Sequence, residues 1–226
     1  MDKKPHYFGH RARLRERFLK AGAESLADYE MLEMLLFLAH PRRDVKPTAK
    51  ALLKKFGSFA KVIRAKPDAL LDIPGIGATA IAALKTVQAA ALKLVREEVM
   101  NQPVIGNWQQ LLDHLHASMA HEEKEHFRLL FLDRKNAILA DEVQQSGTID
   151  HAPIYPREVV KRALDLNASA IIMVHNHPSG DPTPSKADIA ITKAVQAACQ
   201  KLGIELHDHI IVAKSGHQSF KSMGLL

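Results

Sequence analysis

Apolar residues recur with a helical period through the first hundred positions of the chain. Leucine and phenylalanine stand three and four positions apart near residues 14–19, 32–37 and 52–56, as on a helix that buries one face. Residues 78–99 form a longer run rich in alanine and leucine. Residues common at helix ends and turns separate these runs: Asp28, Pro41, Pro47, Gly57 and Pro67. The pattern predicts an all-helical domain over residues 1–100.

The pattern changes after residues 101–106 (NQPVIG), which contain a proline and a glycine and which we interpret as a linker. Beyond the linker, helical periods alternate with short apolar runs typical of strands. Helices are predicted over residues 108–119, 156–166 and 185–202, and strands over residues 127–132, 137–145, 168–174 and 204–212. Because interleaved strands and helices are typical of an α/β sandwich, we expect that fold over residues 104–226.

Composition is that of an ordinary globular protein. Apolar residues make up 46% of the chain and charged residues 25%, which excludes a disordered or fibrous protein. The sequence contains no unbroken apolar run near the ~20 residues of a membrane helix, and its basic start lacks the apolar segment of a secretion signal. A single cysteine, Cys199, excludes an internal disulfide framework. We therefore expect a cytoplasmic protein with no membrane partner.

The charge is unevenly distributed between the two halves of the chain. Residues 1–100 hold 19 lysines and arginines against 11 acidic residues, whereas residues 101–226 hold 12 against 14. The basic excess therefore lies in the helical half. A polyanionic partner such as DNA is expected for that half only, with a merely solvated basic surface as the alternative.

The segment that follows residues 168–174 concentrates reactive side chains. His175 and His177 stand two positions apart where a buried strand ends, so both imidazoles point to the same side of the sheet. A proline-rich loop then leads to Ser185 and Asp188 on the first turn of the next helix, where Asp188 can face the histidines. Two imidazoles and a carboxylate leave the fourth position of a tetrahedral zinc open. Zinc lowers the pKa of bound water from ~16 towards ~7, as hydrolysis near neutral pH requires.

Other readings of these residues remain open. Ser185 and Asp188 also match a capping box, which needs no metal. That box does not account for two histidines that leave an apolar strand beside a stiff loop. Asp181 is an alternative carboxylate ligand, although the spacing favours Asp188.

A second cluster of possible ligands, His207, Asp208 and His209, lies in the last predicted strand. On a regular strand His207 and His209 share one face and Asp208 points to the other, so the three cannot all bind one ion without distortion. A separate metal site at this cluster is the less favoured alternative. We expect structural roles for them, or a role for Asp208 or His209 in orienting a ligand imidazole.

The spacing of His175, His177, Ser185 and Asp188 matches the JAMM (MPN-type) metalloprotease motif at every position. With HNHPSGDPTPS around that motif, DHIIV downstream and GHRARLRERF upstream, essentially the whole chain resembles the RadC family. The resemblance implies a deaminase-like (MPN/JAMM) α/β sandwich that binds one Zn²⁺ per chain through His175, His177 and Asp188. It further implies that Ser185 stabilises the oxyanion of a tetrahedral intermediate.

The JAMM pattern also requires a glutamate upstream that accepts a proton from the water at the metal and passes it to the leaving amine. Glu125 is the favoured candidate, because it has the strand parity of the alternate apolar residues in 127–131 and so emerges on the same side of the sheet. Glu122 and Glu123 are close alternatives, and Glu142 is a weaker one.

Residues 70–90 resemble a helix-hairpin-helix, with the turn IPGIG between two helical stretches. Gly75 and Gly77 permit a tight turn and let a phosphate approach the N–H groups that begin the second helix. Lys85 on that helix is a further candidate for a phosphate contact. The motif predicts DNA binding through residues 1–100, and a hairpin used only for packing is the alternative.

Three functions follow from these observations. The leading hypothesis is a zinc hydrolase of the JAMM type that cleaves a peptide or isopeptide bond. A non-catalytic, DNA-associated protein with a structural zinc is the first alternative. A zinc hydrolase that acts on a nucleic acid or a small amide is the second.

Overall fold

The computed structural model describes residues 9–100, 103–144 and 154–226. Parts of the predictions lie outside the described residues: residues 1–8 of the helical domain, residues 101–102 of the linker, and residues 145–153 of the sandwich, of which residue 145 belongs to a predicted strand. The chain divides into two compact units, Met1–Ala91 and Leu92–Leu226. The division falls within a long helix, a few residues before the linker expected from the sequence.

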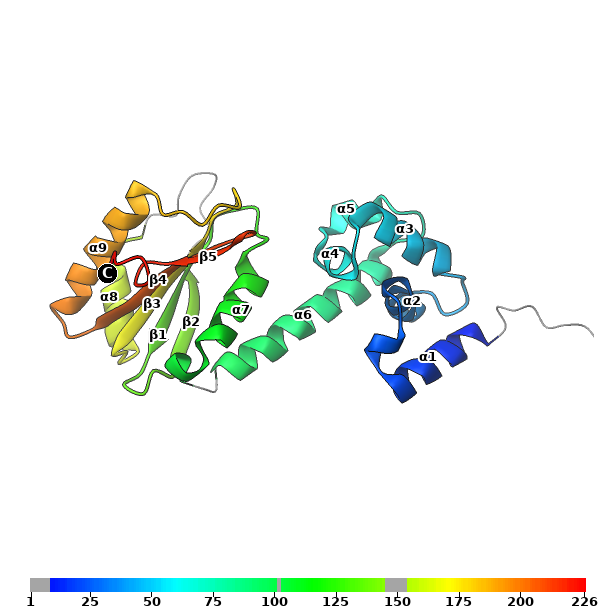
Figure 1. The fold of residues 1–226 in the computed structure, drawn as a ribbon, viewed down its shortest axis with the longest axis horizontal. Coiled ribbons are helices and arrows are strands. Elements are labelled where there is room, and N and C mark those ends of the chain that lie inside the picture. The colour runs from blue at the N-terminus through cyan, green and yellow to red at the C-terminus, as the bar shows by residue number, and fades with distance from the viewer. Residues whose placement is uncertain (1–8, 101–102, 145–153) are drawn as a thin grey trace, which may run out of the picture. The chain divides into compact units, whose positions relative to one another are not determined.

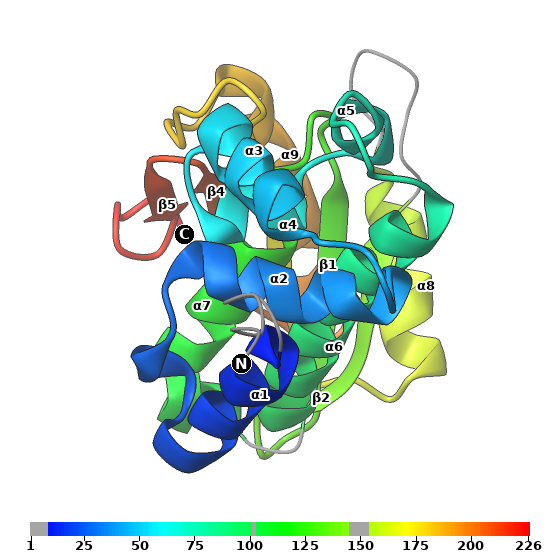
Figure 2. The ribbon, with the colours of Figure 1, turned by 90° about the vertical axis from the view of Figure 1, so that its right-hand side faces the viewer.

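The first unit is built from helices throughout its described residues (Figures 1 and 2). Its elements are α1 (His10–Ala21), η1 (Ala23–Ser25), α2 (Asp28–Ala39), α3 (Lys46–Phe56), α4 (Phe59–Arg64), α5 (Pro67–Leu71) and the first part of α6 (Ala78–Met100). The predicted breaks lie at helix ends: Gly57, with φ of 92°, closes α3, and the Ser58 hydroxyl caps α4. Leu32, Leu52 and Leu84 lie in one shared core.

The turn Asp72–Gly77 joins α5 to α6, as the helix-hairpin-helix pattern predicts. Ile73 and Ile76 are buried and anchor the turn in the core of the unit. Gly75 has φ of 90°, in the left-handed region that favours glycine. A Cβ at that position would lie 2.8 Å from the Arg43 guanidinium, so the arginine lies directly over the turn.

One helix among the described residues meets the length and composition expected of a membrane span. It is the segment Ala78–Glu97 of α6, with a mean hydropathy of 1.3. Ala80 and Leu84 of this segment belong to the core of the helical unit, and core helices of water-soluble proteins also pass such a test. The absence of a membrane partner stays a prediction.

The second unit is an α/β sandwich around one five-stranded sheet (Figure 1). Its strands are β1 (Phe127–Leu132), β2 (Ile138–Gln144), β3 (Ala170–Asn176), β4 (Glu205–Ala213) and β5 (Gly216–Ser219), and its helical segments are η2 (Val104–Asn107), α7 (Trp108–Met119), α8 (Pro156–Asp165) and α9 (Lys186–Gln200). The strand order is β2-β1-β3-β4-β5, with β3 and β4 parallel and the other pairs antiparallel. The predicted fold class is confirmed.

Helices cover both faces of the sheet, as Figure 1 shows. α7 packs on one face, where Leu115 meets Ile172 and other strand residues. α8 and α9 cover the opposite face, where Ala163 and Val195 pack against strand residues such as Met173. β3 is therefore buried on both sides, which explains its continuous apolar run.

Two details of the sheet differ from the predictions. The strand predicted last, β4, is followed by β5, whose short polar sequence GHQS carries no apolar alternation. In β4 the pairing with β3 shifts at His207, so that Asp208 pairs with Ile172 and His209 with Met173. The extra residue is a β-bulge, which reverses the alternation after it. The prediction that His207 and His209 share a face is therefore wrong.

Candidate metal centre

His175 and His177 lie together where β3 leaves the sheet. His175 is paired with Phe127 of β1, whose ring stacks on the imidazole with a centroid separation of 5.7 Å. The His177 N–H donates to the carbonyl of Val212 in β4 at 2.9 Å. The two imidazole centroids lie 4.8 Å apart, on one side of the sheet as the strand alternation predicts.

Asp188 on the first turn of α9 brings a carboxylate to both histidines. His175 Nε2 lies 3.0 Å from His177 Nε2 and 3.3 Å from Asp188 Oδ1, and His177 Nε2 lies 3.5 Å from Asp188 Oδ2. Donors bound to one tetrahedral zinc at ~2.0–2.2 Å are about 3.3 Å apart. The three side chains thus form a group that can hold a single metal ion.

The charges of this group suit a cation. Burial alone would raise the pKa of Asp188, but hydrogen bonds from His175, His177 and Ser185 hold that pKa far below its ordinary value, so the carboxylate is ionised. The hydrogen bond to Asp188 raises the pKa of His177 despite partial burial, and the charge of Glu125 adds to this effect. Protons therefore compete with a metal ion for His177.

The Nδ1 atom of His177, the ring nitrogen that points away from His175 and Asp188, is hydrogen-bonded by the loop that follows β3. We call this atom the outer nitrogen of the ring. Nδ1 lies 2.8 Å from the carbonyl oxygen of Asp181, which can only accept, so Nδ1 carries a proton. In the neutral ring Nε2 then offers its lone pair to a metal, whereas in the protonated ring it donates to Asp188. The Asp181 carboxylate turns back to the loop and accepts from the N–H of Thr183 at 2.9 Å and from its hydroxyl at 2.7 Å. Asp181 therefore supports His177 through its backbone.

The outer nitrogen of His175 is held by a buried chain of hydrogen bonds. The Thr192 hydroxyl donates to the Asp188 carbonyl at 2.5 Å, so it accepts from His209 Nδ1 at 2.6 Å. His209 Nε2 is then the acceptor for His175 Nδ1 at 2.8 Å. Burial, the largest cause, holds the pKa of His209 well below its ordinary value, in keeping with a neutral ring. The chain leaves the lone pair of His175 Nε2 directed at the metal position.

The sequence indicates only part of this series of hydrogen bonds. It suggests an orienting role for Asp208 or His209, and the structure assigns that role to His209. The role of Thr192 cannot be predicted from the sequence, because a threonine within a helix carries no distinct signal. Its position four residues after Asp188, one helical turn further on, is the hint that the sequence offers.

Ser185 and Asp188 form a capping box, and Asp188 is at the same time a member of the candidate metal group. The Ser185 hydroxyl accepts from the Asp188 N–H at 3.1 Å, and Asp188 Oδ2 accepts from the Ser185 N–H at 2.7 Å. The two readings of this pair are therefore compatible. The cap fixes the Asp188 carboxylate while both of its oxygens remain close to the imidazoles.

Among the candidate bases, Glu125 acts electrostatically on a histidine of the metal group. It is half-buried, just before Phe127, and its charge acts on His177. Glu122 and Glu123 are exposed. Glu142 is bound by the Arg162 guanidinium of α8, with Oε1 3.0 Å and Oε2 3.1 Å from Nε.

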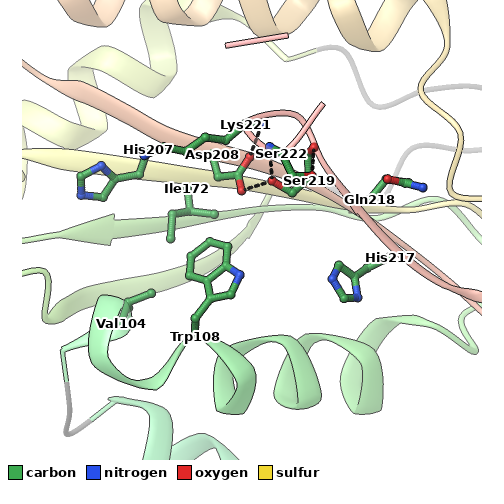
Figure 3. Close-up of a pocket in the computed structure, with 10 residues that line it drawn as sticks. All are labelled: Val104, Trp108, Ile172, His207, Asp208, His217, Gln218, Ser219, Lys221 and Ser222. Atoms are coloured by element: carbon green, nitrogen blue, oxygen red, sulfur yellow. Dashed lines mark hydrogen bonds between the residues drawn. The ribbon is translucent and has the colours of Figure 1, made fainter. Parts of the chain in front are cut away.

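Two members of the second cluster, His207 and Asp208, lie in a different region, shown in Figure 3. A pocket of about 590 Å³ lies between α7 and β4–β5, where the Trp108 ring points toward the sheet beneath Ile172. Asp208 is 2% exposed and accepts from the Ser219 hydroxyl at 2.5 Å and the Lys221 N–H at 3.0 Å. It therefore anchors the segment after β5, on the sheet face opposite the histidines. His207 Nε2 contacts Asn136 Oδ1 at 2.6 Å.

Cys199 has the surroundings expected of a core residue. It is fully buried in α9 among apolar side chains. Burial raises the pKa of its thiol to about 11, so the thiol stays protonated near neutral pH. This agrees with a packing role.

The candidate phosphate contacts of the helical unit do not converge in the same way. Lys85 Nζ donates to the Ile63 carbonyl and to Gln88 Oε1, both at 2.9 Å, and burial lowers the pKa of this lysine. Arg11, in the basic segment GHRARLRERF near the start of the chain, donates to the Pro41 carbonyl at 2.7 Å. These cations contact their own unit, whereas Gly77 at the start of α6 is exposed.

The sheet order, its two helical layers and the His–His–Asp group define an α/β domain of the JAB type. Residues 105–225 match the family model described as the RadC-like JAB domain, and residues 8–82 match the one described as the UPF0758 N-terminal domain. The chain belongs to this RadC (UPF0758) family, as its motifs indicate.

Two relatives illustrate how far the similarity extends. A UPF0758 protein of Rhodobacter capsulatus is 56% identical over 213 residues, which cover 94% of this chain and 100% of the relative. A UPF0758 protein of Ruegeria pomeroyi is 54% identical over 217 residues, which cover 96% of this chain and 97% of the relative. The similarity therefore extends over both units.

Proposed function

We propose that this protein is a zinc-dependent hydrolase of the JAMM type that cleaves a peptide or isopeptide bond. One observation carries the proposal. The Nε2 atoms of His175 and His177 lie 3.0 Å from each other, and each lies 3.3–3.5 Å from an oxygen of the Asp188 carboxylate. The Nδ1 atoms of both histidines are already hydrogen-bonded elsewhere. Such an arrangement directs all three donors at one point and fixes the tautomers that a metal requires.

The donor set favours zinc and an open coordination position. His175, His177 and Asp188 would hold the ion, and two imidazoles with one carboxylate are typical of hydrolytic zinc sites. When bound, zinc would supply a Lewis acid that polarises a carbonyl and lowers the pKa of water. Among the described residues the group has these three members, which favours an enzyme over a structural site closed by a fourth protein ligand.

Two further side chains would carry out the proton transfer and charge stabilisation. Glu125, which is half-buried and whose charge acts on His177, would accept a proton from the attacking water and hold it for the leaving amine. The Ser185 hydroxyl accepts the Asp188 N–H, and with substrate bound it would donate its own proton to an oxyanion.

The test compares the E125Q and E142Q variants with the wild type. Zinc content is measured by atomic emission, and cleavage by the release of new amines from a library of linear peptides and lysine-linked isopeptides. We expect about one zinc per chain in all three proteins. Turnover should fall ~10²–10⁴-fold in E125Q, because general acid–base catalysis contributes that much, and stay unchanged in E142Q, whose carboxylate is bound by Arg162.

Other outcomes would identify another function. Zinc without cleavage of any library member in the wild type would favour the structural-zinc alternative, or a hydrolase for nucleic acids or small amides. Unchanged turnover in E125Q would assign the base to another residue.

We also propose that the helical unit binds DNA through its hairpin turn. Arg43 lies directly over Gly75, at the start of α6 where helix N–H groups favour an anion. The basic excess of residues 1–100 supports the same partner. Contacts of this kind would hold the phosphate backbone without reading base sequence.

A further inference from the structure

Asn176 stands between the two metal-site histidines and is completely buried. Its side chain reaches across to the segment that precedes β1. Oδ1 accepts from the His126 N–H at 2.8 Å, and Nδ2 donates to the Lys124 carbonyl at 3.0 Å. The Asn176 backbone N–H adds a bond to the His126 carbonyl at 3.3 Å. The backbone on both sides of Glu125 is thus bound to one residue of β3.

These hydrogen bonds continue the link between β1 and β3 beyond the point where their regular backbone pairing ends. β1 begins at Phe127, which pairs with His175 on one side and with Gln144 on the other. Residues 124–126 lie before these pairs, where a backbone donor and acceptor would otherwise need other partners. An asparagine amide offers one acceptor and one donor in a fixed plane, whereas aspartate lacks the donor and alanine lacks both.

We propose that Asn176 is the positioning residue for Glu125, and that it fixes the distance from this carboxylate to the metal. The inference rests on the proposed function, in which Glu125 is the base. Because His175 and His177 flank Asn176 in β3, one residue ties the proton acceptor to the strand that carries two of the ligands. Small displacements of a reacting group are costly, and a shift of about 1 Å can lower a rate ~10²-fold.

The test uses the full chain loaded with Co²⁺ and follows the pH midpoint of the cobalt absorption spectrum. Wild type, N176A, N176D and E125Q are compared with the double variant E125Q/N176A. The matched control is S169A. It removes another side-chain bond between the same two strands, from Ser169 to the Leu132 carbonyl at 3.3 Å, at their opposite end. Hydrogen exchange of the His126 amide is measured in the metal-free proteins.

We expect N176A to accelerate exchange at the His126 amide at least about tenfold, since that amide loses its acceptor. The pH midpoint of the cobalt spectrum of N176A should move at least halfway from the wild-type value to the E125Q value. In the E125Q background N176A should cause no further shift, because additivity fails when one residue acts through another. N176D keeps the acceptor and should fall between wild type and N176A, and S169A should match wild type.

A wild-type midpoint in N176A, or an equal shift with and without Glu125, would overturn the role of Asn176 alone. If the wild-type protein shows no cobalt spectrum, or if the E125Q midpoint equals the wild-type midpoint, the proposed function is overturned. The inference about Asn176 then fails with it.

Discussion

The histidine cluster of the sandwich differs from the hairpin turn of the helical unit in how neighbouring groups hold the functional side chains. In the cluster, the outer atoms of His175 and His177 are bound by His209 and by a loop carbonyl, so the inner atoms converge. In the hairpin, Lys85 is bound by a carbonyl of its own unit. A motif specifies residue types, but a site forms only where neighbouring groups direct the functional atoms to one point.

The two regions also differ in how well they stabilise the charged form of their functional groups. Asp188 holds a charge that hydrogen bonds from buried or half-buried rings stabilise. Lys85, by contrast, loses basicity through burial, which is unfavourable for a phosphate contact. The comparison therefore predicts strong effects from changes in the cluster and weak ones from Lys85.

The largest effect is expected from the metal ligands themselves. The H175A and D188N variants should lose the zinc that the wild type retains, because each removes a donor from a three-residue set. Metal content after dialysis measures this, with circular dichroism to verify the fold. D181N is the control and should keep its zinc, since the Asp181 carboxylate contacts Thr183. Retention of zinc by H175A and D188N would contradict the assignment.

A smaller effect is expected from the chain that orients His175. In the T192V variant the side chain keeps its shape but loses the hydroxyl that links His209 to the Asp188 carbonyl. Zinc affinity, measured by competition with a chelator, should fall ~10–100-fold, as for other residues that orient a ligand. T183V, which alters a hydroxyl bonded to Asp181, serves as the control. An affinity unchanged in T192V would show that His209 suffices without this threonine.

The smallest effects concern the helical unit. If the hairpin binds DNA, the full chain should bind duplex DNA with an affinity that falls steeply with salt. R43A should weaken this binding for all sequences and reduce the salt slope by about 1. K85A should bind as the wild type does, because Lys85 is engaged within its own unit. Absence of binding at low salt would end the proposal, and a reduced slope in K85A would mean that Lys85 leaves Ile63.

Much of the fold can be predicted because the periods of apolar residues are strong. The helix over Trp108–Met119 and the strand over Phe127–Leu132 have their predicted bounds. β5 was missed because four polar residues at a sheet edge bury too little to leave a pattern. The bulge at His207 was missed because one extra residue changes no composition, yet it decides which face His209 joins.

The sequence by itself determined the two-part organisation, the residue types of the candidate metal group and the strand parity that puts two imidazoles side by side. Periodicity and spacing are local properties, and they persist whatever the chain packs against. Only the tertiary structure decided that Thr192 and His209 fix the tautomer of His175, that Glu142 is bound by Arg162, and that Asn176 holds the backbone around Glu125. Each depends on hydrogen bonds between residues that lie far apart along the chain or on different elements, and these contacts form only when the strands and helices pack together.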